Sequence, residues 1–236
     1  MSTPSGSPGG KKNAPGSGAR RILGILDREV SDRETPIARE AGGRPYFTDF
    51  HADFNISHSR DMAAVAFSGA GSPPPVFPPR PGQNGRPFRV GCDIQYMHPR
   101  KNRAAIAERF FSGAERDRIA AAGGNRLFYM IWTLKECWLK LRGLSVFDMG
   151  KAPVFCVGTA PGERGAGEPP PVDFYLYELE GEGESYMLAA ARERGYGSPP
   201  SAPPVLRWFS ETTLRVSSID EIYAAPSPEK TAMPKS

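Results

Sequence analysis

The most informative stretch of the sequence is Trp132 to Lys140, W-T-L-K-E-C-W-L-K. At about 100° per residue on a helix, Trp132, Glu136 and Lys140 stand at successive i, i+4 positions and share one polar flank. The residues expected to bury the helix lie on its other side: Ile131, Leu134, Trp138 and Leu141. Glu136 and Lys140 would then point into a cleft, where a carboxylate beside an ammonium suits a metal-bound phosphate. While this segment stands alone, an ordinary surface ion pair is the simpler explanation.

The composition is that of a soluble globular protein with a sizeable core. The chain has 236 residues, of which 39% are hydrophobic and 24% charged, which suits one domain or two small ones. No run approaches the roughly 18 apolar residues of a membrane span, and the first twenty residues or so lack the apolar core of a secretory signal. We therefore expect a cytoplasmic protein with no membrane partner. Three cysteines without a C-x-x-C pair indicate reduced thiols rather than disulfides or zinc ligands.

The charge balance is mildly basic, with a formal net charge of +4 and a pI near 9.0. Basic and acidic residues are interleaved from Asp27 onward, and no nucleic-acid module signature is present. We therefore expect no nucleic-acid partner. A weakly positive field suits an acidic protein or a polyphosphate ligand.

Proline and glycine divide the chain into segments. The ends, 1–19 and 226–236, have the composition of disordered tails. Loops are predicted at 72–81, 160–171 and 197–204. Hydrophobic spacing predicts helices at 20–30, 102–111, 113–121 and 132–141, and strands at 53–56, 62–67, 89–94, 154–157, 174–179, 186–191 and 205–209. Bunched strands among helices favour an α+β fold with antiparallel sheets.

Two oxygen donors lie close together in the segment G-C-D-I-Q, residues 91–95. Because alternate side chains of a strand share a face, Asp93 and Gln95 would point together, away from the core that their apolar neighbours enter. Magnesium is usually held by one or two carboxylates with phosphate and water, so Asp93 with Glu136 would suffice. Taken singly, an aspartate at a strand end has a simpler explanation in a turn or a solvent contact.

A second polar run, F-N-I-S-H-S, occupies Phe54 to Ser59. Its Ser57 and His58 could donate hydrogen bonds to a phosphate. Upstream, Gly43-Arg44-Pro45 offers a cation on a turn. A local turn or a satisfied histidine explains each of these groups when it is considered alone.

In this order, the motifs resemble those of the 4′-phosphopantetheinyl transferases of the Sfp type. That family's motifs read approximately G-K-P, F-N-x-S-H-S, G-x-D-x-E, R-F-F-S-x-x-E and W-[ST]-x-K-E-x-x-x-K. The corresponding segments here are Gly43 to Pro45, Phe54 to Ser59, Gly91 to Gln95, Arg109 to Glu115 and Trp132 to Lys140. The resemblance covers about residues 37–145.

The resemblance implies a fold of two pseudo-symmetric α+β halves, each with a small antiparallel sheet packed on helices. Coenzyme A would bind in the cleft between the halves, which would span 20–87 and 88–225. The implied reaction moves 4′-phosphopantetheine from coenzyme A to a serine of an apo acyl or peptidyl carrier protein. It depends on magnesium and releases adenosine 3′,5′-bisphosphate. A chain with both halves can form the cleft as a monomer.

The resemblance also implies roles on the metal side. Asp93 and Glu136 would ligate magnesium, and Glu136 is the candidate base for the serine hydroxyl, directly or through water. Gln95 stands where the family commonly has a third acid. Its amide oxygen can still act as a ligand, but the lost negative charge should weaken the site. Lys135 would help to bind phosphate or to stabilise the leaving group.

On the coenzyme side, Lys140 would hold the pyrophosphate as a point charge. Ser57 and His58 match positions that contact the phosphates of the coenzyme, with His58 reaching the 3′-phosphate. Arg44 matches the position beside the adenine nucleotide. Trp132, with the pair Phe110-Phe111, is expected to pack rather than to touch the ligand.

Two further departures concern length. The sequence L-R-G-L-S after Lys140 is shorter than the family's K-x-x-G-x-G-L-S, and the first half is short, so that family basic residues there correspond only to Arg20 or Arg21. Gln95 leaves open a non-catalytic module that binds coenzyme A or a carrier protein through a degenerate metal site. A basic, proline-rich interaction protein is a weaker alternative.

Overall fold

The computed structural model describes residues 37–48, 52–68, 89–158, 172–181, 183–194, 202–206, 214–220 and 222–225. Several predictions lie outside these residues. They are the helix at 20–30, the loops at 72–81 and 160–171, the tails at 1–19 and 226–236, and the roles of Arg20 and Arg21.

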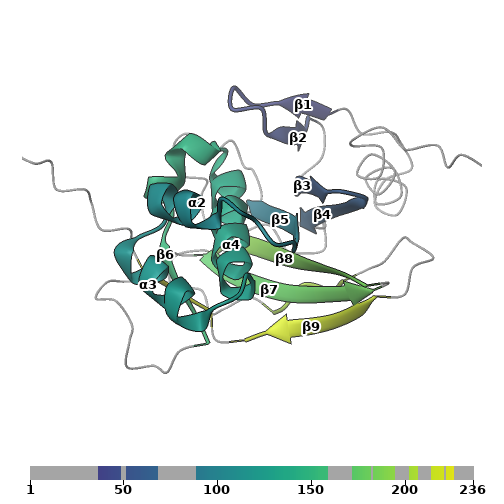
Figure 1. Cartoon of the computed structure of the whole chain (residues 1–236). Helices are drawn as coiled ribbons and strands as arrows, with labels where there is room; N and C mark the ends of the chain where they lie inside the picture. The colour runs from purple at the N-terminus through teal and green to yellow at the C-terminus, as the bar shows by residue number, and fades with distance from the viewer. Residues whose placement is uncertain are drawn as a thin grey trace, which may run out of the picture.

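A four-stranded antiparallel sheet forms the base of the fold (Figure 1). Its strands are β5 (Val90–Tyr96), β8 (Glu184–Glu193), β7 (Val172–Gly181) and β9 (Arg215–Ile219), in that order. The β7–β8 hairpin pairs Leu176 with Ala189 and Tyr177 with Leu188. Leu176 and Ala189 belong to the main core, whereas Tyr177 and Leu188 belong to a second cluster. Alternation along the strands therefore buries both faces of this sheet.

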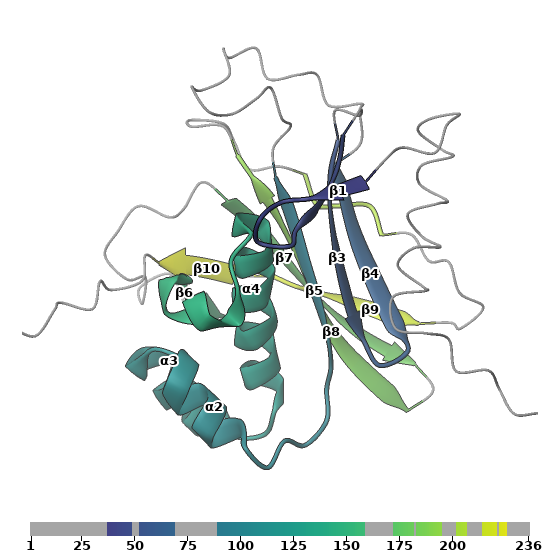
Figure 2. The same cartoon turned by 90° about the horizontal axis from the view of Figure 1, so that it is seen from above.

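One face of the sheet is covered by α4 (Arg126–Arg142), beyond which lie α2 (Arg103–Phe110) and α3 (Gly113–Ala122) (Figures 1 and 2). The helix ends at Gly143, whose φ of 69° is left-handed and suits glycine. It begins earlier than the predicted 132 because Phe128 to Ile131 are also buried. The prediction of a polar flank is wrong at Trp132, which is buried and stacks on Phe128 at 6.1 Å between ring centroids.

The packing predicted for the aromatic residues is confirmed. Phe110 and Phe111 lie 5.9 and 6.2 Å from Trp132, ring centroid to ring centroid. Trp138, which was expected in the buried stripe, is only partly buried. The middle of the helix, from Phe128 to Lys135, is therefore buried, and partly exposed residues lie toward both of its ends.

The described residues 37–48 and 52–68 form two hairpins. They are β1 (Ile37–Arg39) with β2 (Pro45–Phe47), and β3 (Asp53–Ser59) with β4 (Met62–Ser68). Phe47, Ala52 and Phe54 form their small core. In Figure 2, β3 runs beside β5. A further pair joins β6 (Val154–Val157) to β10 (Ile222–Ala225), and η1 (Val146–Lys151) follows α4.

The α+β class with antiparallel sheets is confirmed. The strand predicted at 205–209 is wrong in its described part, because residues 205 and 206 have no regular structure. None of the helices in the described ranges combines the length and apolar character needed to span a bilayer. The division into pseudo-symmetric halves stays a prediction.

Candidate active site

Side chains of β3 hold β5 in place. Every second residue of β3 turns toward β5 and accepts a hydrogen bond from a backbone N–H on the strand's free edge. The four bonds, 2.8–3.2 Å long, join Asp53 to Val90, Asn55 to Cys92, Ser57 to Ile94 and Ser59 to Tyr96. These oxygens take the place of a neighbouring strand's carbonyls, so the edge of β5 is satisfied. This contact explains why every second side chain of the F-N-I-S-H-S segment is polar.

Gly91 lets α4 approach β5 closely. A Cβ added at Gly91 would lie 2.6 Å from the carbonyl oxygen of Cys137 and 2.9 Å from Cβ of Leu141. No larger residue fits between the strand and the helix without moving one of them. This contact brings Asp93 and Gln95 against the next residues on the same side of the helix.

Asp93 is the centre of the polar cluster. Its Oδ1 accepts hydrogen bonds from Nζ of Lys140 at 2.6 Å and Oγ of Ser57 at 2.8 Å. Its Oδ2 accepts one from Nε2 of Gln95 at 2.9 Å. Asp93 and Gln95 therefore share a face, as predicted. The prediction that this face points away from the core is wrong for Asp93, which is fully buried because α4 covers it.

Glu136 completes the cluster from the helix. Its Oε2 accepts a hydrogen bond from the same Nε2 of Gln95 at 3.1 Å. Burial, with the nearby charge of Asp93, raises the pKa of Glu136 to about 8, while Lys140 and Arg100 act in the opposite direction. A carboxyl group with such a pKa can exchange a proton near neutral pH.

Lys140 lies between Asp93 and Ser57. Its Nζ donates to Oδ1 of Asp93 and, at 2.7 Å, to Oγ of Ser57. Burial favours the neutral amine, but the Asp93 carboxylate outweighs it and raises the pKa of Lys140. The lysine is therefore an ammonium, and its side chain is 31% exposed.

Ser57 is buried and has no spare hydrogen-bonding capacity. Its hydroxyl donates to Asp93 and accepts from Lys140 and from the backbone N–H of Ile94. A hydroxyl offers one donor and two acceptor sites, so all three are in use. His58, the next residue on the strand, is exposed.

Arg44 is buried with 5% of its surface exposed. Its Nη1 donates to the carbonyl of Lys140 at 2.6 Å, and its Nη2 forms an ion pair with Asp53 and donates to the carbonyl of Val90 at 2.8 Å. The arginine thus links β2 and β3 to β5 and the end of α4. Its predicted contact with a nucleotide stays a prediction.

Lys135 does not join the cluster. It is buried, with Nζ 3.1 Å from Oε1 of Glu115 and 3.0 Å from the carbonyl oxygen of Pro153. A step of about 100° along the helix turns it away from its neighbour Glu136. Glu115 also accepts from the backbone N–H of Ser112, closing the capping box of α3. The placement therefore argues against the predicted catalytic role for Lys135 and indicates a structural one.

A second polar group, which the sequence did not single out, lies on the same side of α4 as Glu136. Oη of Tyr129 accepts from Nε of Arg100 at 3.1 Å and donates to the carbonyl of His98 at 2.9 Å. Tyr129 lies two helical turns before Glu136 on the same side of α4, which is the signal that could have revealed it. Through this contact Arg100 is held close enough to lower the pKa of Glu136.

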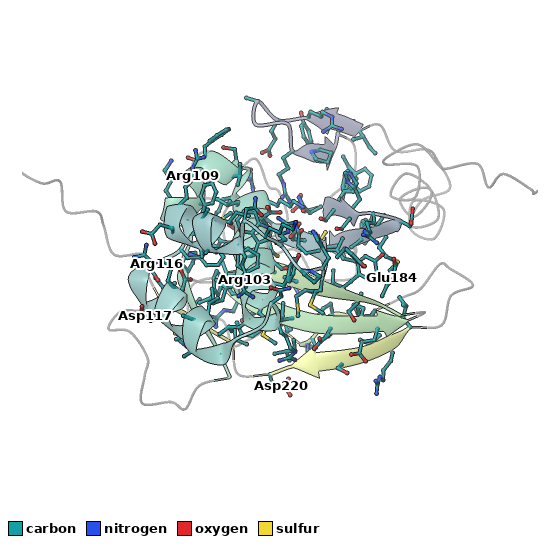
Figure 3. The ribbon with its side chains drawn as sticks, viewed as in Figure 1. Arg103, Arg109, Arg116, Asp117, Glu184 and Asp220 are labelled. Carbon is teal, nitrogen blue, oxygen red and sulfur yellow. The ribbon has the colours of Figure 1, made fainter. Side chains whose placement is uncertain are left out.

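A hollow of about 160 Å³ opens beside the cluster at the C-terminal end of α4. Its walls are Glu136, Leu139, Lys140, Leu144 and Val146. Figure 3 shows the crowded side chains between α4 and the strands, with the labelled Arg116 and Asp117 out on α3. Glu136 and Lys140 are thus the parts of the cluster that a ligand in the hollow would meet.

The cluster has the donors that magnesium prefers. Asp93 and Glu136 supply carboxylate oxygens, which phosphate and water can complete to a hard oxygen set, whereas the amide of Gln95 directs its nitrogen at both of them. Among the described residues, no group of three or more His, Cys, Asp or Glu side chains gathers as a metal site. The residues therefore fit a metal held jointly with a phosphate ligand rather than in a closed protein cage.

Comparison with known proteins gives the family. The family model described as "4′-phosphopantetheinyl transferase superfamily" matches residues 89–191. The 4′-phosphopantetheinyl transferase AcpT of Escherichia coli strain K12 is 31% identical over 150 residues, covering 60% of this chain and 68% of that protein. AcpT of Salmonella typhi is 31% identical over 134 residues, covering 56% and 60%. The transferase pptA of Paxillus involutus is 27% identical over 206 residues, covering 78% and 72%.

The matched segments thus span 60% to 72% of these relatives' own lengths. The model match includes the strand with Asp93 and the helix with Glu136 and Lys140. The resemblance seen in the motifs is confirmed at this level: the chain belongs to the 4′-phosphopantetheinyl transferase superfamily.

Proposed function

We propose that this protein is a 4′-phosphopantetheinyl transferase of the Sfp type. It would transfer 4′-phosphopantetheine from coenzyme A to a serine of an apo acyl or peptidyl carrier protein and release adenosine 3′,5′-bisphosphate. One observation carries the proposal. Asp93 and Gln95 on β5 meet Glu136 and Lys140 on α4 beside an open hollow, in a chain of the transferase superfamily.

In the transfer, the serine oxygen forms a bond to the β-phosphorus of coenzyme A, and the bond to the oxygen bridging to the adenosine bisphosphate breaks. Magnesium held by Asp93 and Glu136 would neutralise the charge on the pyrophosphate oxygens. Glu136 accepts the serine proton, directly or through water. The electron pair of the broken bond stays on the leaving bisphosphate.

Lys140 is the residue proposed to orient the pyrophosphate. An ammonium has three hydrogens, of which Asp93 and Ser57 take two. The third is available to a phosphate oxygen entering the hollow that Lys140 lines. These two hydrogen bonds hold the Lys140 ammonium in position before the ligand binds, so less side-chain entropy is lost on binding.

His58 and Arg44 are proposed to contact the 3′-phosphate and the adenine nucleotide. His58 is exposed, as such a contact requires. Arg44 would first have to release part of its buried hydrogen bonds to Asp53, Val90 and Lys140. His58 is therefore the better supported of the two. We propose a monomeric, cytoplasmic protein.

A non-catalytic module that binds coenzyme A or a carrier protein is the second candidate. The observation that favours it is the amide of Gln95, which adds no charge where the family commonly has an acid. Such a module would bind coenzyme A without modifying any carrier.

The test is intact-mass analysis of a broad panel of apo carrier proteins after incubation with the full chain, coenzyme A and magnesium. The proposal expects a gain of one phosphopantetheine on at least one carrier, which the same reaction with chelator lacks. Asp117→Asn on the exposed face of α3 is the matched control and should retain activity. Coenzyme A binding without mass gain on any carrier would favour the module and overturn the transferase.

A further inference from the structure

The amide nitrogen of Gln95 lies between the two carboxylates. It is 2.9 Å from Oδ2 of Asp93 and 3.1 Å from Oε2 of Glu136. A side-chain amide has two hydrogens on nitrogen, so one bond to each carboxylate uses both. The oxygen of the amide therefore points away from the two carboxylates.

The same two oxygens are the ones open to a metal. Oδ1 of Asp93 already accepts from Lys140 and Ser57, whereas Oδ2 accepts from Gln95. Asp93 and Glu136 would hold a magnesium ion on this side of their carboxylates. The amide nitrogen occupies that region, so the ion and the amide hydrogens compete for one place.

We infer that Gln95 is a metal-responsive spacer. In the metal-free protein its amide nitrogen bridges Asp93 and Glu136 and keeps the two side chains facing each other. When a divalent cation enters, the amide turns and presents its oxygen to the ion. This inference rests on the proposed function for the identity of the metal ligands.

A glutamate at this position could not serve both states. Ionised, it has no hydrogen to donate and would place a third carboxylate against Asp93 and Glu136. The metal-free site would then spread apart, while the filled site would gain charge and bind the cation more tightly. Gln95 thus lowers the affinity for the metal, but it keeps Asp93 and Glu136 in place before the metal binds.

The test compares the full chain with Gln95→Glu and Gln95→Met. Methionine has similar length but no amide hydrogens. In chelator, both variants should unfold at a midpoint temperature roughly 3–6 °C lower, because the bridging hydrogen bonds are lost. With magnesium alone, Gln95→Glu should bind about tenfold more tightly than the wild type in calorimetry, and Gln95→Met should not. Asp117→Asn is the charge-changing control and should behave as the wild type.

A direct readout follows the side-chain amide of Gln95 by nitrogen-15 NMR in the unmutated protein. Its signal is assigned as the one that disappears in Gln95→Met, or in Gln95→Glu where the methionine variant does not fold. Titration with magnesium alone should shift this signal as the amide releases the carboxylates. An unmoved signal while calorimetry reports magnesium binding overturns the inference, and so does equal stability of the three proteins in chelator.

The same samples separate this inference from the proposed function. A shifted amide signal in a protein that modifies no carrier supports the spacer and defeats the transferase. Transfer to a carrier with an unmoved amide signal supports the transferase and overturns the spacer.

Discussion

Replacing Gly91 by alanine should open the active site by forcing α4 and β5 apart. The new Cβ would stand 2.6 Å from the carbonyl oxygen of Cys137, 2.9 Å from Cβ of Leu141 and 3.1 Å from its backbone nitrogen. A carbon and a carbonyl oxygen normally approach to about 3.3 Å, so the helix and strand must separate by roughly 0.7 Å. Both obstacles are backbone or Cβ atoms, which no rotamer change can move aside.

The expected cost is about 2–3 kcal/mol, at the upper end for overpacking a tight interior. For a chain of this length that corresponds to a lowering of the midpoint temperature by roughly 5–10 °C. The separation also lengthens the bond of 3.1 Å between Gln95 and Glu136 beyond hydrogen-bonding distance. Transfer measured well below the midpoint should therefore fall about tenfold at limiting magnesium.

Gly150→Ala is the matched control, because a Cβ added there meets nothing within 4 Å. Urea denaturation and transfer at several magnesium concentrations measure the two effects separately. If Gly91→Ala unfolds within about 0.5 kcal/mol of the wild type and transfers at the normal rate, the close contact is not what positions Glu136.

Four further predictions concern charge. Because burial raises the pKa of Glu136 to about 8, protons compete with the metal for this carboxyl group below pH 8. Magnesium affinity should therefore fall by up to about tenfold per pH unit from pH 8 to pH 6 and be constant above pH 8. A magnesium affinity that calorimetry finds independent of pH would contradict this prediction. The stability of the metal-free protein should depend on pH in the opposite direction. Its free energy of unfolding should decrease as the pH rises from about 4.5 to 8, because the folded state binds a proton on Glu136 that the unfolded state has lost. Lys135→Met leaves Glu115 buried without its partner and should cost about 3–5 kcal/mol in urea denaturation, whereas normal stability with lost transfer would return Lys135 to the chemistry. Lys140→Ala should weaken coenzyme A binding, more so at low magnesium, and unchanged affinity in calorimetry would remove Lys140 from the phosphate site.

The part of the site that follows from local periodicity could be predicted from the sequence. Alternation on a strand placed Asp93 and Gln95 on one face, as the hydrogen bond between them confirms, and helical spacing placed Glu136 beside Lys140, with which it lines one hollow. The burial of Asp93 could not be predicted in this way. It depends on α4 lying across the sheet, and a strand pattern does not report what covers its face.

Tertiary partners account for the other differences. Lys135 matches the family motif and is the sequence neighbour of Glu136. Its side chain, however, pairs with Glu115 of another helix and therefore points elsewhere. Arg44 and Ser57 carry polar groups that a ligand could use, yet Asp53, Asp93 and nearby backbone groups already bind them. The hydrogen bonds between β3 and β5 come from an alternating polar pattern that also fits an exposed strand.

The most direct test of the central claim, that Asp93 and Glu136 form the catalytic centre of a phosphopantetheinyl transferase, is a time course of carrier-protein mass. Apo carrier, coenzyme A and magnesium are mixed with the wild type, Asp93→Asn, Glu136→Gln or Asp117→Asn. We expect one added phosphopantetheine per carrier with the wild type and the Asp117 control, and none with the two site variants although each still folds. Undiminished transfer by Glu136→Gln, or no transfer by the wild type to any carrier, would contradict it.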